Sequence, residues 1–176
     1  MRQSGFSGGA ERWYAERSPI LDALDSGELL DMGCANGYLL ECLVRWGRAR
    51  GIHLTPHGLD CAPGLIALAR QRLPQHAGHI HQGNAWDWEP PQRYAQVYSV
   101  WDCVPPEHFD RYVQRLLHAV VAPGGLLVMG SYGNRSRGEL AAPIDVHLAS
   151  LSLPVLGTCA AGAQGLACFA WVRAAF

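Results

Sequence analysis

Short apolar runs alternate along this chain with stretches in which apolar residues recur at helical spacing. The run Glu28–Met32 is bounded by a glycine and is typical of a buried parallel strand. The period then changes over residues 36–48, where Leu39, Leu43 and Trp46 share one face. The pattern therefore predicts a strand followed directly by an amphipathic helix.

The same alternation continues toward the C-terminus. One predicted strand ends at 58–60, and another, at an exposed sheet edge, covers 79–81. Two further strands are predicted at 94–101 and at 126–131, the second of them after a turn at 123–125. Predicted helices cover 62–73, 107–121 and 143–152, and a final hairpin pairs 155–160 with 166–173. Repeated strand–helix units favour a three-layer α/β fold whose mostly parallel sheet gains an antiparallel C-terminal strand.

The N-terminal region is expected to differ from the repeating units. Residues 1–10 are rich in Gly and Ser and are predicted to form a flexible leader, whereas residues 11–25 are predicted to be helical. A length of 176 residues suggests that 1–176 is a single domain.

Composition excludes some chemistry. All 14 basic residues are arginine, so no lysine is available for a Schiff base or for a lysine-containing phosphate loop. The net charge of −1 gives no general attraction to nucleic acid or to an anionic membrane.

Other features indicate a reduced, cytoplasmic setting. No N-terminal apolar stretch resembles a secretory signal, and no run of about 18 apolar residues is present. The six cysteines form no C-x-x-C pair and are expected to be reduced thiols. Of eight histidines, His53/His57 and His79/His81 are closely spaced, but an ordinary polar surface explains them and no metal site is expected.

The loop Asp31–Gly37, which joins the first strand to its helix, is the main candidate for ligand binding. Glycines at this position allow a ligand to approach the backbone closely. The dinucleotide pattern G-x-G-x-x-G fails, because Ala35 and Tyr38 stand at its later glycine positions. Asp31 at the strand end favours a cationic ligand, although a plain strand–helix turn without a ligand is an alternative.

Four segments, in order, resemble those of the class I S-adenosylmethionine-dependent methyltransferases. They are Asp31–Gly37, Gly58–Asp60, Gly83–Ala85 and Ala122–Gly125. This resemblance implies a Rossmann-like, seven-stranded sheet of order 3-2-1-4-5-7-6, with S-adenosylmethionine bound at the ends of the first three strands.

The resemblance also implies roles for individual residues. Asp31 would attract the amino group of the methionine portion, and Asp60 would accept hydrogen bonds from both ribose hydroxyls; a role for Asp60 at the start of the next helix is compatible. The implied cofactor-binding residues on these two loops are Asp31, Gly33, Cys34, Ala35, Asn36, Asp60 and Cys61.

The third segment would bind the adenine. Asn84 stands where the family often has Asp and would accept from the adenine amino group, while the Ala85 amide would reach a ring nitrogen. Trp86 would cover the adenine face, or would be an ordinary surface tryptophan.

Catalytic residues are less well defined by the sequence. Asp102 and His108 follow the strand at 94–101 and are the candidate general bases; alternatively, they are a turn cap and a first-turn helix residue. Tyr132 and His147 are further candidates. A base is needed only if the acceptor carries a proton of high pKa.

Substrate selection is expected to involve the N-terminal helix as a lid. Trp13 and Tyr14 belong to this helix, and Trp101 and Tyr132 lie at the rim. Aromatic residues on the helix could equally pack on the sheet.

The expected activity is methyl transfer to an oxygen or nitrogen of a small molecule. An RNA methyltransferase is one alternative, and it would need a basic rim. The arginines available for such a rim are Arg12, Arg17, Arg135 and Arg137. A non-catalytic binding module that retains the cofactor fold is the other alternative.

Overall fold

A seven-stranded sheet forms the middle of the molecule. The computed structural model describes residues 8–162 and 165–175. The strand order is β3-β2-β1-β4-β5-β7-β6, and β7 runs antiparallel to both of its neighbours. The expected order and the reversed strand are confirmed. The strands are β1 (Gly27–Met32), β2 (Leu54–Asp60), β3 (Ile80–Gln82), β4 (Tyr94–Val100), β5 (Val121–Tyr132), β6 (Gly157–Ala161) and β7 (Ala167–Arg173).

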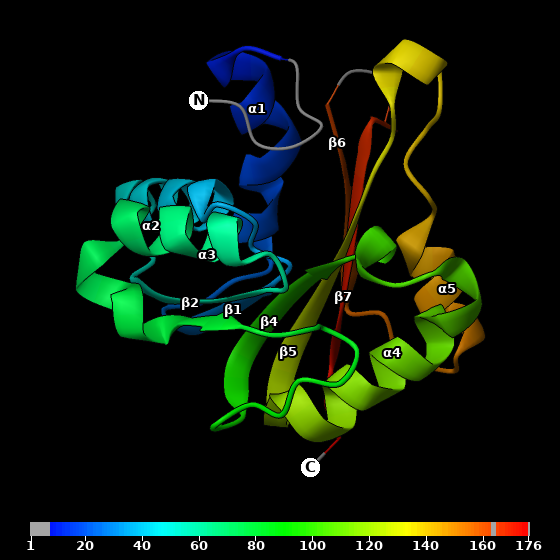
Figure 1. Cartoon of the computed structure of the whole chain (residues 1–176). Coiled ribbons are helices and arrows are strands. Elements are labelled where there is room, and N and C mark those ends of the chain that lie inside the picture. Colours follow the sequence, from blue (N-terminus) through cyan, green and yellow to red (C-terminus); the bar gives the residue numbers. More distant parts are fainter. Residues whose placement is uncertain (1–7, 163–164, 176) are drawn as a thin grey trace.

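Helices cover both faces of the sheet, as the repeated strand–helix pattern predicts (Figure 1). One face carries the N-terminal helices together with α2 and α3, and the other carries α4 and α5. The α-helices are α1 (Ala10–Arg17), α2 (Tyr38–Ala49), α3 (Pro63–Arg72), α4 (Phe109–Arg115) and α5 (Ile144–Ser150). The 3-10 segments are η1 (Ser18–Asp22), η2 (Pro74–His79), η3 (Trp101–Cys103), η4 (Pro106–His108) and η6 (Arg135–Arg137).

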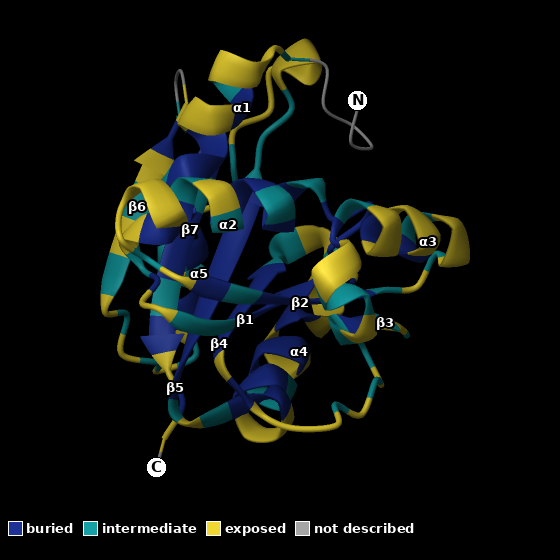
Figure 2. Cartoon of the chain, turned by 90° about the vertical axis from the view of Figure 1, so that its left-hand side faces the viewer, coloured by how far each residue is buried: buried dark blue, intermediate teal, exposed yellow. Residues whose placement is uncertain are grey.

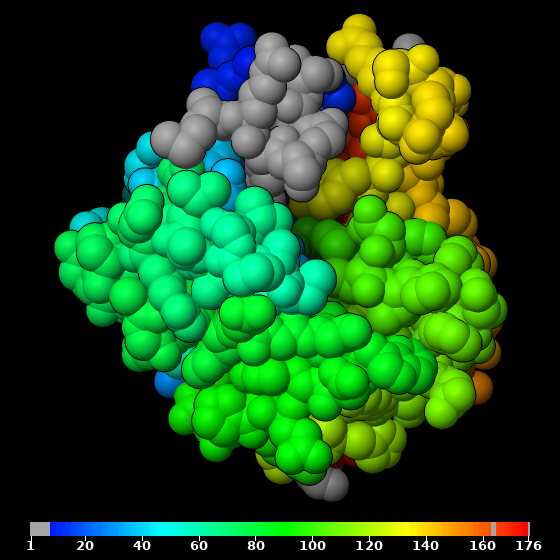
Figure 3. Space-filling model, viewed as in Figure 1, coloured from blue at the N-terminus to red at the C-terminus, as the bar shows by residue number. Residues whose placement is uncertain are grey.

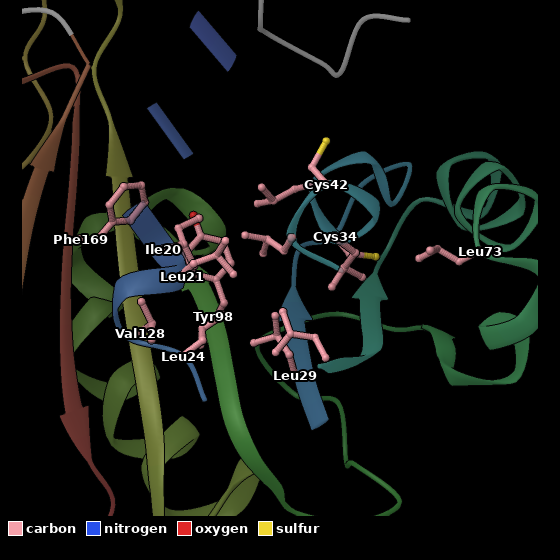
Figure 4. Packing of buried hydrophobic residues seen from close by; sticks show 14 of the residues in the cluster. Ile20, Leu21, Leu24, Leu29, Cys34, Cys42, Leu73, Tyr98, Val128 and Phe169 are labelled. Carbon is pink, nitrogen blue, oxygen red and sulfur yellow. The ribbon is translucent and has the colours of Figure 1, made fainter. Parts of the chain in front are cut away.

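The central strands are buried on both faces, which explains their continuous apolar runs (Figure 2). Successive side chains of β5 point to opposite faces, so Val128 packs with the N-terminal helices and Leu127 with α4. Figure 4 shows Ile20 and Leu21 of η1 near Tyr98 and Val128. The N-terminal helical region is therefore anchored to the middle of the sheet.

The predicted helix at 107–121 is less regular than expected. It consists of η4, α4 and a π-helical turn, η5 (Leu116–Val120), and β5 begins at the next residue. The pairing of β5 with β4 moves from Tyr94–Val121 to Gln96–Leu126. The predicted turn at 123–125 is therefore an irregular segment within β5 rather than a separate connection.

The edge strand expected at 79–81 is confirmed as β3, but it begins one residue later. His79 belongs to η2 and stacks on His57 of β2, with 4.2 Å between ring centroids and 3° between planes. The histidine expected on an exposed strand therefore packs against a buried one.

His57 lies in a setting that disfavours its charged form. The side chain is buried beside Tyr94 and His79, and neither ring nitrogen makes a hydrogen bond within the described structure. Burial, and next the neighbouring His79, lower the pKa of His57 to about 4, although the Glu28 carboxylate 3.4 Å from Nε2 acts in the opposite direction.

This burial predicts a pH-dependent contribution to stability. Between the folded pKa near 4 and an unfolded value of about 6.5, the unfolded chain binds more protons at His57, so stability falls as pH falls through this window. Urea unfolding of His57→Leu, measured from pH 7 to pH 4, should show a shallower loss of stability than the parent protein. The exposed His53 provides the control, because His53→Gln should leave the slope unchanged. Identical slopes for the parent and His57→Leu would contradict this assignment.

Within residues 8–162 and 165–175, no helix has both the length and the apolar character needed to cross a membrane. The same residues contain no group of three or more His, Cys, Asp or Glu side chains arranged to hold a metal ion.

Candidate functional site

The candidate site lies where the strand order changes direction. From β1 the chain proceeds outward to β2 and β3, and it then returns to β4 on the other side of β1. In such parallel sheets, the loops at the carboxyl ends of the two diverging strands leave a crevice that binds ligands. The loops after β1 and β4 are therefore the structural basis of the site.

The loop after β1 is held against the end of β2 and has no room for a side chain at its first glycine. The amides of Gly33 and Cys34 both donate to the carbonyl of Leu59, at 2.8 and 2.9 Å. Gly33 has a φ of 90°, and a Cβ there would lie 2.9 Å from the Cys103 sulfur. Its backbone is exposed, so a ligand can approach it directly.

Asp60 joins the loops after β1 and β2. Its Oδ2 accepts the Ala35 amide and its Oδ1 accepts the Ala62 amide, both at 2.9 Å. The N-cap position of the helix that follows is Ala62, and no side-chain hydrogen bond caps this helix. An ionised carboxylate offers about four acceptor positions, so these two bonds are compatible with further hydrogen bonds to a ligand. Asp60 is partly exposed and shapes these loops, although it is not among the residues that line the two cavities described below.

A cavity of about 420 Å³ opens above these loops. Its walls come from α1, the loop after β1, the end of β4 and the segment after β5. Figure 3 shows the segment at residues 133–140, in yellow, forming an upper corner of the molecule. Six of the residues that the sequence indicated for the cofactor, the acceptor or catalysis meet at this cavity: Trp13, Asp31, Gly33, Ala35, Asp102 and Tyr132.

The floor of the cavity is polar but buried. Burial, and next the nearby Asp60, raise the pKa of Asp31 to about 7. The hydroxyls of Tyr98 and Tyr132 share a hydrogen bond of 2.8 Å, and burial raises the pKa of Tyr132 to about 12. Burial also raises the pKa of Tyr98, so both hydroxyls stay protonated at neutral pH, and a cation beside Asp31 would favour its charged form.

A second cavity, of about 540 Å³, lies beside the loop after β3. Asn84, Trp86 and His108 line it, and the Trp86 and His108 rings lie 5.2 Å apart. The side-chain oxygen of Asn84 accepts a hydrogen bond from the Trp86 backbone amide at 3.0 Å, so the Asn84 side chain stabilises the turn in which it lies. The structure thus places His108 beside the predicted adenine-binding residues and not in the cavity that contains Asp102.

Several predicted residues lie outside both cavities. Tyr14 packs edge-on against Trp46, on another face of α1, and Trp101 packs on Phe109 and His147 with centroid distances of 4.3 and 4.4 Å. A direct role at the main cavity is therefore not supported for Tyr14, Trp101 or His147.

Three residues of the predicted cofactor set shape or flank the loops. Cys34 is buried, and burial raises the pKa of its thiol, so it is a packing residue. Asn36 is also buried, and its side chain accepts the Tyr38 amide at 3.2 Å. Cys61 is exposed directly after Asp60. Ala85, the adenine-binding candidate, packs with the core cluster on the α4 face.

The sequence indicated Arg17 and Arg137 only as arginines of a basic rim for RNA, and both line this cavity. It did not indicate the other lining residues Tyr98, Asn134 and Glu139. The polar hydroxyl of Tyr98, within the otherwise apolar strand β4, was a signal in the sequence that could have indicated a residue of this site. Gln96, two residues earlier, has a structural role instead: its side chain exchanges hydrogen bonds of 2.8 and 2.9 Å with the backbone of Asp25.

The comparisons with known proteins agree with this geometry. A family model described as a methyltransferase domain matches residues 29–125, more than half of the chain. The chain belongs to this methyltransferase family. The resemblance to class I S-adenosylmethionine-dependent methyltransferases is thereby confirmed for the family, and solved structures support the fold.

Among curated methyltransferases, the chain is similar to a trans-aconitate 2-methyltransferase of Methylobacterium nodulans. The two are 34% identical over 101 residues, which are 57% of this chain and 36% of the relative. A malonyl-[acyl-carrier protein] O-methyltransferase of Serratia marcescens is 31% identical over 134 residues, 74% of this chain and 48% of the relative. The matches thus extend over less than half the length of these curated relatives.

Two solved structures show the same methyltransferase fold. The DhpI complex with S-adenosylhomocysteine has a TM-score of 0.66 and 17% identity, covering 94% of this chain and 85% of the other. The CcbJ methyltransferase of Streptomyces caelestis has a TM-score of 0.66 and 12% identity, covering 96% and 97%.

The left-handed backbone of Ala35 leads to a stability prediction. At a φ of 48° a Cβ is disfavoured by about 1 kcal/mol, and glycine removes this strain while it loses more backbone entropy. Ala35→Gly should therefore change the free energy of unfolding by less than about 0.5 kcal/mol. Ala67→Gly, in the exposed interior of α3, should lower it by about 1 kcal/mol. Chemical denaturation measures both; an equal loss in the two variants would contradict the strain at Ala35.

Proposed function

We propose that this methyltransferase-family protein transfers a methyl group from S-adenosylmethionine to an oxygen or nitrogen of a small molecule. The observation that carries the proposal is the cavity in which Asp31 and Gly33 face Asp102 and the aromatic residues Trp13 and Tyr132. Residues of the predicted cofactor loop and a candidate base line one half-open cavity at the end of the sheet.

The described residues fit S-adenosylmethionine. Asp60 provides carboxylate oxygens for a vicinal diol such as that of ribose, and the exposed Gly33 backbone allows close approach. Asp31 provides a buried carboxylate for an ammonium group. When bound, the cofactor supplies a methyl group that is already activated by its sulfonium.

Because that methyl group is activated, the protein contributes mainly by positioning the acceptor and excluding water. Trp13 and Tyr132 would enclose the acceptor. Asp102, exposed at the rim of the same cavity, is our candidate for removing a proton from an acceptor that carries one. His108 would act beside the adenine subsite rather than as this base.

A small acceptor is supported by the size of the cavity, which at about 420 Å³ falls in the range of small-molecule sites. The names of the two curated relatives, which specify trans-aconitate and malonyl carrier protein, also favour acceptors with a small reacting group. We further propose that residues 1–176 form one methyltransferase domain; a cytoplasmic location stays a prediction.

Acceptance of RNA is less well supported by the arginines considered for a basic rim. Arg12 and Arg17 both pair with Glu16, and Arg137 pairs with Glu139 at 3.0 Å. These carboxylates reduce the positive potential that RNA binding requires. The other alternative, a non-catalytic module, would bind the same cofactor but would form no methylated product. An assay for that product therefore distinguishes it from the proposed enzyme.

Cofactor binding can be tested by calorimetric titration with S-adenosylmethionine and S-adenosylhomocysteine. We expect micromolar binding by the parent protein and about tenfold or more weaker binding by Asp60→Asn, because an amide has one acceptor oxygen where the carboxylate has two. Asp25→Asn is the control: Asp25 is exposed and precedes β1, at the opposite edge of the sheet, so its change should not affect binding. A parent protein that binds neither compound would contradict the proposed function.

RNA binding can be tested by electrophoretic mobility with bulk tRNA. A small-molecule enzyme with paired rim arginines should show no complex at low salt, where phosphate contacts are strongest. A complex whose affinity falls steeply with salt, and falls further in Arg135→Gln, would favour the RNA alternative instead.

A further inference from the structure

Two hydroxyl groups at the floor of the main cavity form a pair that the proposed function does not use. The hydroxyls of Tyr98 in β4 and Tyr132 in β5 lie 2.8 Å apart. Tyr98 is 1% exposed, Tyr132 is half-buried, and both residues line the cavity. They reach this floor from neighbouring strands, on the face of the sheet that packs against the N-terminal helices and α2.

A count of protons shows that this pair has one hydrogen-bond donor to spare. Each hydroxyl carries one proton, and the bond between the two groups uses one of them. Burial raises the pKa of Tyr98 and of Tyr132, so both protons remain in place at neutral pH. Within residues 8–162 and 165–175, neither hydroxyl makes another hydrogen bond. One O–H group therefore has no acceptor in the described part of the protein, which is costly at a buried position.

Asp31, the carboxyl group on the same floor, does not accept this proton. It lies beside Tyr98 in the pairing of β1 with β4, and its charge raises the pKa of both tyrosines. No hydrogen bond joins Asp31 to either hydroxyl among the described residues. The floor therefore offers a ligand one hydrogen-bond donor and one carboxyl group, at separate atoms.

The position of the tyrosine pair separates it from the proposed cofactor loops. Those loops follow β1 and β2, whereas the tyrosines belong to β4 and β5, on the other side of the change in strand direction. Asp102, the candidate base, follows β4 on that same side and lines the same cavity. The pair thus lies with the groups that would act on the methyl acceptor.

We propose that the Tyr98–Tyr132 pair is a subsite whose spare O–H group donates a hydrogen bond to an oxygen of the methyl acceptor. The inference rests on the proposed function and adds a requirement to it, which is an acceptor with a carbonyl or comparable oxygen. A fixed donor favours such a compound over an analogue of the same shape that lacks the oxygen, because the analogue leaves the buried O–H group unpaired. The tyrosines would select and orient the acceptor, and removal of its proton remains with Asp102.

An NMR titration of the full chain, saturated with S-adenosylhomocysteine, tests this selection with two probes of the same shape. Acetophenone has a carbonyl oxygen, and α-methylstyrene has a methylene group in its place. The variant Tyr98→Phe/Tyr132→Phe removes both hydroxyls from the cavity. The matched control Ser99→Ala/Tyr112→Phe removes another buried hydroxyl pair, also 2.8 Å apart, whose residues are not among those that line either cavity.

The parent complex should bind acetophenone about fivefold or more tightly than α-methylstyrene, because only the ketone satisfies the spare O–H group. The Tyr98→Phe/Tyr132→Phe variant should bind the two probes about equally, and it should bind S-adenosylhomocysteine as tightly as the parent protein does. The control variant should keep the parent's preference. In parent protein labelled with ¹³C at the tyrosine Cζ atoms, acetophenone should shift the signals of Tyr98 and Tyr132 but not that of Tyr112.

Equal affinity of the parent complex for the two probes, or no binding of either, would overturn the inference. So would a preference for acetophenone that persists in Tyr98→Phe/Tyr132→Phe. Weaker binding of S-adenosylhomocysteine by this variant would assign the pair to the cofactor and would overturn it as well. If the variant does not fold, the Cζ signals of the parent protein decide, since equal shifts with both probes contradict the inference. Failure of the parent protein to bind S-adenosylhomocysteine contradicts the proposed function instead.

Discussion

The site depends on one constraint, which is the attachment of the loop after β1 to the end of β2. The Asp60 carboxylate accepts the amides of Ala35 and Ala62, and the Leu59 carbonyl accepts two amides of the β1 loop. These bonds fix a tight turn with left-handed backbone at Gly33 and Ala35. They leave the Gly33 backbone exposed beside the buried Asp31, so one turn provides both access for a ligand and a carboxyl group at the floor.

The parallel strands and the remaining walls of the cavity have different roles. The parallel strands β1 to β5 position the loops that face the cofactor. These strands are buried and closely packed, so they tolerate few substitutions. The remaining cavity walls come from α1 and from the segment after β5, where Trp13, Arg17 and Tyr132 combine aromatic surface with a buried cation. Both elements lie outside residues 29–125, which the family model matches, and their role in selecting the methyl acceptor stays a prediction.

Much of the fold was predictable, because strand and helix periods depend on burial, and burial here is strong. The sheet order followed from a family resemblance rather than from periodicity. The strand–helix pattern indicated the loop that holds Asp31, Gly33 and Ala35, whereas Asp60 and the cofactor roles followed from the family resemblance. It did not predict that Tyr14 and Trp101 pack away from the cavity, or that Arg17 is buried in the cavity wall rather than on an exposed basic rim. These placements depend on how α1 and η3 rotate against the sheet. One-residue shifts also escape it, as the inward packing of His79 shows.

The central claim is that the β1 and β2 loops hold S-adenosylmethionine, and an amide-resolved NMR titration with S-adenosylhomocysteine tests it most directly. We expect the largest chemical-shift changes at Gly33, Ala35 and the residues that follow Asp60, with little change at Gly27 and Leu54, which begin β1 and β2 at the opposite edge of the sheet. Saturable shifts confined to the opposite edge of the sheet, or the absence of shifts at Gly33 and Ala35, would contradict it.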